Sequence, residues 1–172
     1  MDEAYCEALE TAIEFERNGE VFYRELLEKV SDPFAKKVLE FLADEEVEHI
    51  RKIEVFNDSL LGKDWFDFEA ECGLDLHERI RDLVQEKRQG ANKNVNPSSN
   101  DLDIYDIAML LESKSFELYK HALEEPQDEK VETFLRFLLA EEGEHYDLLA
   151  SSKKYLADPS YYFQEYGGWI FG

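Results

Sequence analysis

The chain has 172 residues and a mass of 20.2 kDa, which suits a single domain with a substantial core. Hydrophobic residues make up 44% of it, which argues against a disordered chain. The 19 basic and 41 acidic residues give a formal net charge of −22, which argues against nucleic acid or an anionic membrane surface as a partner, because both would repel it. Such a surface is compatible with attracting cations.

Nothing in the sequence predicts secretion or membrane insertion. The first residues, Met1–Cys6, have neither the basic region nor the apolar run of a signal peptide. No apolar stretch approaches the roughly 20 residues that span a bilayer. The two cysteines, Cys6 and Cys72, form no Cys-x-x-Cys pair, so we expect unpaired thiols and no cysteine-ligated metal. These features predict a cytoplasmic protein.

Two helices are predicted in the first third of the chain. Apolar residues recur at helical spacing over residues 2–30 and again over residues 33–61. Between them, Asp32 can cap a helix and Pro33 suits its first turn, while Gly62 is a plausible stop. The short connection predicts an antiparallel pair.

Residues 62–100 predict a crossover that carries the chain to a second pair of helices. The apolar residues Leu74, Leu76, Ile80, Leu83 and Val84 indicate a shorter amphipathic helix within it, and the turn formers of residues 90–100 predict an exposed loop.

A second pair of helices is predicted after the crossover. Asp101 or Asp103 can cap a third helix that runs to about residue 125, and a fourth covers about residues 128–156. We therefore predict an all-α fold, a ferritin-like four-helix bundle over residues 1–158 with a long crossover between helices 2 and 3. The aromatic tail, residues 159–172, is expected to pack on the bundle or on a partner subunit.

A short motif of a carboxylate and an imidazole three residues apart occurs twice. Glu46-Val47-Glu48-His49 and Glu142-Gly143-Glu144-His145 lie 96 residues apart. The same offset joins further pairs of identical residues: Glu16 and Glu112, Tyr23 and Tyr119, Phe41 and Phe137, and Glu45 and Glu141. A repeat of potential ligands at one fixed offset indicates a duplicated half-site.

The repeated residues interrupt the apolar stripes of the predicted helices, so their side chains should point into the core. Buried carboxylates are costly unless they are paired, protonated or bound to a metal. Carboxylates with imidazole nitrogen suit iron or manganese, and zinc less specifically. The predicted ligand set for two metal ions is Glu16, Glu46, His49, Glu112, Glu142 and His145.

Other polar residues near the motifs have supporting or alternative roles. Tyr23 and Tyr119 are either core aromatics or hydrogen-bond donors to the ligand carboxylates, and we favour the donors. Glu20 is an auxiliary ligand candidate one turn after Glu16, although Phe116 stands at its repeat position. His121 is predicted on the surface, and we assign no role to His77. The acidic residues that flank the ligands, Glu45, Glu48, Glu141 and Glu144, can be ordinary solvated charges.

The four motifs together resemble the ligand helices of rubrerythrin-type ferritin-like proteins over about residues 5–157. The resemblance implies a di-iron site in which Glu46 and Glu142 bridge the metals. It also implies that Glu16 and Glu112 are terminal carboxylates, and that His49 and His145 each hold one metal. These proteins often have a second glutamate one turn after the third-helix ligand, where this chain has Ser115.

The resemblance implies a non-haem di-iron oxidoreductase that reduces peroxide, with peroxide or oxygen as the oxidant. Full-length rubrerythrins carry a rubredoxin domain with two Cys-x-x-Cys pairs, which this sequence lacks, so we expect an external electron donor such as a rubredoxin-like protein. A homo-oligomer is expected as well. Two alternatives stay open: a ferroxidase that handles iron, and a non-catalytic metal-binding bundle whose aromatic tail engages a partner.

Overall fold

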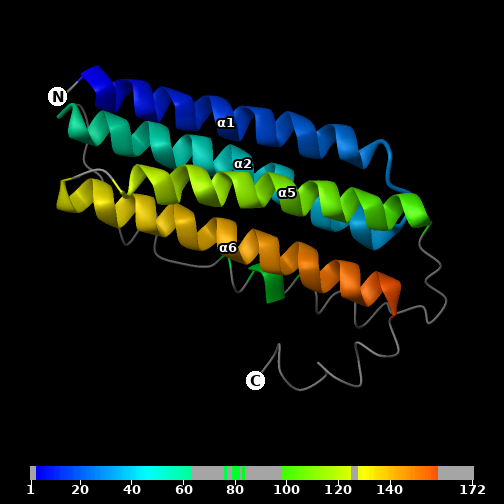
Figure 1. Cartoon of the computed structure of the whole chain (residues 1–172). Helices are drawn as coiled ribbons and strands as arrows, with labels where there is room; N and C mark the ends of the chain where they lie inside the picture. The colour runs from blue at the N-terminus through cyan, green and yellow to red at the C-terminus, as the bar shows by residue number, and fades with distance from the viewer. Residues whose placement is uncertain are drawn as a thin grey trace.

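The structure is a computed structural model that describes residues 3–62, 76, 79–81, 83, 98–124 and 128–158, without the side chains of residues 3–8 and 99. The described chain is dominated by four long helices: α1 (Glu3–Leu27), α2 (Pro33–Leu60), α5 (Ser99–Ala122) and α6 (Glu129–Ala157). Their bounds agree with the predicted ranges to within a few residues. Figure 1 shows the helices aligned side by side as a bundle.

The start and end of α2 follow from the residues predicted there. The carboxylate of Asp32 accepts hydrogen bonds from the backbone N–H groups of Phe34 and Ala35, at 2.8 and 2.9 Å, and Pro33 occupies the first turn. At the other end Gly62 has a φ of +68°, a left-handed conformation that a residue without a Cβ adopts readily and that stops the helix.

The predicted cap of α5 was wrong. Ser98 caps the helix, because its hydroxyl accepts from the backbone N–H of Asp101 while the carboxylate of Asp101 accepts from the backbone N–H of Ser98. This reciprocal capping box starts the helix earlier than a cap at Asp101 or Asp103 would. Asp101 also accepts hydrogen bonds from the backbone N–H and the hydroxyl of Ser31, both at 2.7 Å, and thereby ties α5 to the α1–α2 turn.

The helices form two antiparallel pairs. α1 packs against α2, α5 packs against α6, and the pairs meet through α1 with α5 and α2 with α6. In Figure 1 α2 ends at the opposite end of the bundle from the start of α5, so the connection between them spans the bundle's length. This arrangement confirms the predicted ferritin-like four-helix bundle with a long crossover.

Most of the crossover lies outside the described residues. Its described part includes helical residues 79–81, a buried Leu76, and Ile80 and Leu83 packed against the core. The predictions for His77, Cys72, the Cys6 side chain and the tail at residues 159–172 also lie outside the described residues. The division into a bundle and a separate tail therefore stays a prediction.

The core consists of two hydrophobic clusters with a polar belt between them. The cluster near the α1–α2 turn includes Leu42 and Leu149, and the cluster at the other end includes Ile53 and Leu138. On α2 and α6 the Glu-x-x-His motifs lie between these two sets of apolar residues. The predicted ligands are therefore enclosed by packed apolar side chains at both ends of the bundle.

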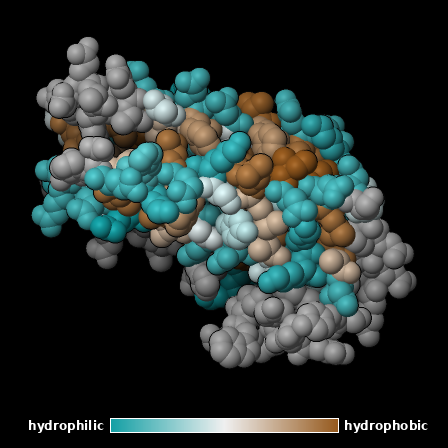
Figure 2. All heavy atoms as spheres, in the orientation of Figure 1, coloured by the Kyte–Doolittle hydropathy of each residue, from teal (hydrophilic) through white to brown (hydrophobic). Residues whose placement is uncertain are grey.

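The bundle carries many polar side chains on its outside. Figure 2 shows hydrophilic side chains spread over one face of the bundle, with smaller hydrophobic areas among them. Across the described residues, none of the helices combines the length and the low polarity that crossing a bilayer requires.

Candidate metal centre

The six predicted ligands converge in the middle of the bundle. Each of the four helices contributes to the group, and every member has an exposed fraction of 0% except Glu46, at 1%. The full set is Glu16 on α1, Glu46 and His49 on α2, Glu112 on α5, and Glu142 and His145 on α6. Burial of four carboxylates in one place requires compensating charge.

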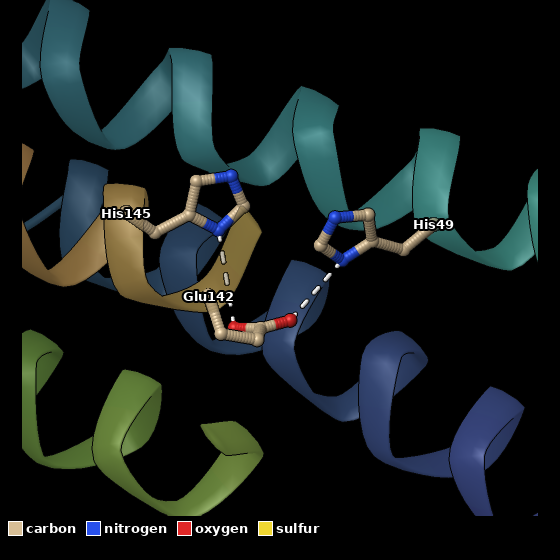
Figure 3. A group of neighbouring side chains, drawn as sticks. All are labelled: His49, Glu142 and His145. Carbon is tan, nitrogen blue, oxygen red and sulfur yellow. Dashed lines mark ion pairs between the residues drawn. The ribbon is translucent and has the colours of Figure 1, made fainter. Parts of the chain in front are cut away.

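The carboxylate of Glu142 lies beside both imidazole rings, with one oxygen directed at each (Figure 3). Its Oε1 is 3.3 Å from Nδ1 of His49, and its Oε2 is 3.9 Å from Nδ1 of His145. The rings are stacked, with centroids 5.3 Å apart and an angle of 21° between their planes. One carboxylate thus faces the same nitrogen of both histidines, which is the placement that a carboxylate bridging two metal ions needs.

The remaining carboxylates divide between the two histidines. Nδ1 of His49 is 3.3 Å from Oε2 of Glu16, and Nδ1 of His145 is 3.5 Å from Oε2 of Glu112. Glu46 can contribute to both halves, because its carboxylate comes within 4.8 Å of ligand atoms from each pair. The arrangement provides two half-sites that share Glu46 and Glu142.

The charges in the cluster oppose one another. Burial and the charge of Glu16 raise the pKa of Glu46, and burial with the charges of Glu112 and Glu16 raises the pKa of Glu142. Burial also acts to raise the pKa of Glu16, but the hydrogen bond with Glu46 and the charge of His49 outweigh it and lower this pKa to about 2. A bound cation would offset the mutual repulsion of these four carboxylates.

Several buried ligand atoms have no hydrogen-bond partner among the described residues. They are Oε2 of Glu112, both carboxylate oxygens of Glu142 and both ring nitrogens of His145. Buried polar atoms are almost always hydrogen-bonded or bound to an ion, so these atoms call for one. Oxygen and imidazole donors suit divalent iron or manganese, and less specifically zinc. The residues present fit two such ions.

Two tyrosines connect the helix pairs by reciprocal hydrogen bonds. The hydroxyl of Tyr23 on α1 donates to Glu112 on α5, and the hydroxyl of Tyr119 on α5 donates to Glu16 on α1. Burial and the neighbouring carboxylates raise the pKa of both phenols, which keeps them protonated as donors. Each tyrosine therefore orients the outer carboxylate of the other half-site, the arrangement that we favoured from the sequence.

A lysine and a glutamate break the symmetry of the two halves. Oε2 of Glu141 lies 3.2 Å from Nε2 of His49 and 3.0 Å from Nζ of Lys52, whose ammonium also lies over the ring of Phe137. Leu148 occupies the repeat position of Lys52, and the equivalent carboxylate, Glu45, pairs instead with Arg79 of the crossover. His49 is thus fixed on both of its nitrogens, whereas Nε2 of His145 has no hydrogen-bond partner among the described residues.

The interpretation of the flanking acids as solvated charges was wrong for Glu45 and Glu141. Their exposed fractions are 0% and 6%, and Glu45 forms an ion pair with Arg79 of the crossover. Glu48 does lie at the surface, where it pairs with Arg51 at 2.9 Å.

Two further residues are placed by the structure. Glu20, the auxiliary candidate, belongs to none of the groups whose ligand atoms lie within 4.8 Å of one another, and it pairs with Arg24 at 3.7 Å. His121 is exposed as predicted, 2.7 Å from Glu124.

Gly19 allows a close approach between α1 and the carboxylate of Glu46 that the sequence did not indicate. A Cβ added there would lie 3.0 Å from Cδ of Glu46 and 3.2 Å from its Oε2. The backbone of α1 therefore approaches this carboxylate more closely than a larger residue would comfortably permit. The repeat position, Ser115, gave no sign of this contact.

A surface pocket of about 560 Å³ lies between α5 and α6 and reaches the cluster. Its innermost lining includes Glu112 and Glu142. The remaining lining residues are Ser113, Phe116, Glu117, Ala140, Gly143, Glu144, Tyr146 and Asp147. The predicted ligands are thus enclosed by the bundle but reachable from one side.

The fold and the cluster together define a ferritin-like carboxylate bundle able to hold metal ions. The family model for rubrerythrin matches residues 7–153, and the chain belongs to the rubrerythrin family. No match was found among curated proteins or among solved structures.

Proposed function

We propose that the protein binds two iron ions in this cluster and reduces peroxide, using electrons from an external donor. The observation that carries the proposal is the position of Glu142 between His49 and His145 in a fully buried set of four glutamates and two histidines. Two ions held close together suit a reaction that needs two electrons at one place.

The overall reaction converts one peroxide molecule, two electrons and two protons into two molecules of water. Iron, when bound, supplies the two electrons as one-electron steps and is reduced again by the donor. The protein's own task is to hold the ions close together and to limit rearrangement of their ligands.

The side chains of this chain divide that task. Glu46 and Glu142 would be shared by the two ions, and the outer carboxylates Glu16 and Glu112 would each bind one. Tyr119 and Tyr23 hold those outer carboxylates in place by their hydrogen bonds. The apolar clusters at both ends keep bulk water away from the site.

The test is an anaerobic comparison of oxidants. The protein is purified without oxygen, iron per chain is counted, and the reduced protein is mixed with hydrogen peroxide or with oxygen. We expect two irons per chain and faster oxidation by peroxide. Oxidation by peroxide that is no faster than oxidation by oxygen would contradict the proposal.

The control is a double substitution of the shared carboxylates, Glu46→Ala with Glu142→Ala. It should lose the metals and the reaction while α1, α2, α5 and α6 still form, because the flanking apolar clusters are untouched. A double variant that keeps two irons would show that the metals bind elsewhere.

A ferroxidase is the second candidate, favoured by the carboxylates that line the pocket between α5 and α6. In this reaction Fe(II) is the substrate, and oxygen takes the electrons. Repeated turnover of added Fe(II) with oxygen, leaving a ferric product, would support it. A protein that holds zinc and never changes redox state would instead be a non-catalytic metal-binding bundle.

The proposal also names partners and a location. The electron donor would be a separate rubredoxin-like protein, the assembly a homo-oligomer and the compartment the cytoplasm. The formal charge of −22 supports the absence of nucleic-acid and anionic membrane partners. The donor is tested by mixing the oxidised protein with a reduced rubredoxin and monitoring the visible absorption of the rubredoxin as it becomes oxidised.

A further inference from the structure

We propose that divalent metal ions reach the cluster from one side only, through the pocket between α5 and α6. This inference rests on the metal site of the proposed function but not on its reaction. The pocket extends inward to Glu112 and Glu142, whose buried Oε2 atoms, with Oε1 of Glu142, have no hydrogen-bond partner among the described residues. Atoms of this kind are ready to accept a cation.

The charge of the pocket favours cations throughout its depth. Among the described residues, five carboxylates line the pocket, and none of the lining residues is a lysine, arginine or histidine. At the rim, Lys120 pairs with Glu117 at 3.2 Å and offsets part of that residue's charge. Glu144 and Asp147 add two carboxylates nearer the surface, and the two predicted ligands end the path. A field of one sign in a cleft raises the local concentration of opposite ions.

The sequence repeat provides an internal comparison, because α1 and α2 present the same positions on the other face. There, Arg17 and Arg51 stand where α5 and α6 have Ser113 and Asp147. A cation approaching that face therefore meets arginines at positions that are uncharged or acidic in the pocket. Both faces carry five carboxylates at these positions, and only the α1–α2 face adds two arginines, so the pocket is the more negative of the two.

Ion pairs also bridge α1 and α2. Arg17 lies 3.6 Å from Glu54, and Arg24 lies 2.8 Å from Asp44. At the repeat positions on α6, Ala150 and Ala140 replace Glu54 and Asp44. Neither of these two bridges can form between α5 and α6, and an ion pair that does join those helices, Lys153 with Asp106, involves no residue of the pocket lining.

Gly143 provides a means of closing the pocket. It lines the pocket, and a Cβ added there meets nothing within 4 Å, so a larger side chain can enter the space without displacing neighbours at its root. Its repeat position is Val47 on α2, which is 42% exposed. Gly143→Phe and Val47→Phe therefore place the same ring at equivalent points of the two faces.

The experiment follows the uptake of Co²⁺ by metal-free protein. Uptake is stopped with EDTA at timed intervals, and cobalt per chain is counted. We expect Gly143→Phe to slow uptake severalfold but to reach the same final stoichiometry, and Val47→Phe to match the unmodified protein. Equal rates in all three proteins, or slowing by Val47→Phe alone, would overturn the proposal.

A charge variant tests the same route without filling it. Asp147→Arg introduces the residue that α2 has at the repeat position, and at low salt it should slow uptake by roughly tenfold, with a smaller effect at high salt. Glu25→Arg, an exposed position on α1, is the control with the same change in net charge. Equal slowing by both variants would show that only the overall charge matters.

The outcomes separate this inference from the proposed reaction. If the iron-loaded protein reacts slowly with peroxide but its Co²⁺ uptake depends on Gly143 and Asp147, the proposed peroxide reduction is contradicted and the entry route between α5 and α6 is supported. Absence of any cobalt uptake by the unmodified protein would contradict both.

Discussion

The ammonium group of Lys52 lies 3.0 Å from Oε2 of Glu141, and both side chains are buried between α2 and α6. Glu141 also contacts Nε2 of His49, so this pair orients the ring of His49 through the nitrogen that does not face the other ligands. The other half-site has Leu148 at the position of Lys52. The two metal positions are consequently inequivalent in a site whose proposed ligands are duplicated.

Lys52→Met should therefore weaken one metal position more than the other. Loss of the ammonium leaves Glu141 without its cation, so His49 is less firmly oriented. We expect the affinity for one equivalent of Co²⁺ to fall by roughly tenfold, and the other to change little. Titration against a competing chelator measures both. Leu148→Met is the matched control, and equal weakening of both equivalents in Lys52→Met would contradict the asymmetry.

The crossed tyrosines predict a second effect on metal affinity. Tyr23→Phe and Tyr119→Phe each remove a hydrogen bond to an outer carboxylate and keep the aromatic ring. Each substitution should lower metal affinity by about tenfold or more, since the freed carboxylate must be ordered again on binding. The same chelator competition applies. Tyr146→Phe, at a residue that is 40% exposed, should leave affinity unchanged, and an equal loss there would refute the prediction.

Two glycines provide a matched pair for the close approach of α1 to Glu46. In Gly143→Ala the added Cβ has no neighbour within 4 Å. Because alanine has a higher helix propensity than glycine, this substitution should raise the free energy of unfolding by up to about 1 kcal/mol. Gly19→Ala places its Cβ 3.0 Å from Cδ of Glu46, so it should gain less and should lower metal affinity. Urea denaturation of the metal-free proteins and Co²⁺ titration measure the two quantities. Unaltered metal binding by Gly19→Ala would show that Glu46 can move freely.

Asp101 predicts a pH dependence of stability. Burial acts to raise its pKa, but hydrogen bonds from Ser31 and Ser98 outweigh burial and bring the pKa below the ordinary value of 3.8. A lowered folded-state pKa means that the charged form stabilises the fold above pH 3.8, and that this contribution is lost as the pH falls through the folded-state pKa.

Asp101→Asn should thus cost about 2 kcal/mol at pH 7, the range expected for hydrogen bonds to a charged group. The difference from the unmodified protein should shrink as the pH is lowered below 3.8. Urea denaturation at both pH values checks this. Asp103→Asn, an exposed position on the same helix, is the control. A difference that stays constant with pH would rule out the charge of Asp101 as its source.

The helices were predictable because their signals are local. Apolar spacing, together with Asp32, Pro33 and Gly62, located α1 and α2 closely. The start of α5 was missed because Asp101 and Asp103 both suit a helix cap, whereas Ser98 caps the helix and Asp101 is its partner in the capping box. A local signal that fits two positions does not choose between them.

The candidate site was predictable where it is repeated and was missed where it is not. The six converging residues all have a counterpart 96 positions away. Lys52 and Arg79 have no such counterpart, and their contacts with Glu141 and Glu45 depend on helix packing that no local pattern encodes. In a chain with 41 acidic residues, a buried glutamate is hard to distinguish from a solvated one, although the offset of Glu45 and Glu141 was a usable signal.

The crossed tyrosine bonds have a thermodynamic consequence. Because Tyr23 completes the half-site of the α5–α6 hairpin and Tyr119 that of the α1–α2 hairpin, neither hairpin contains a finished site by itself. Metal ions bound by ligands from both hairpins would hold the two hairpins together. Their binding free energy and the free energy of docking the two hairpins are linked, so a weaker interface must appear as weaker metal binding.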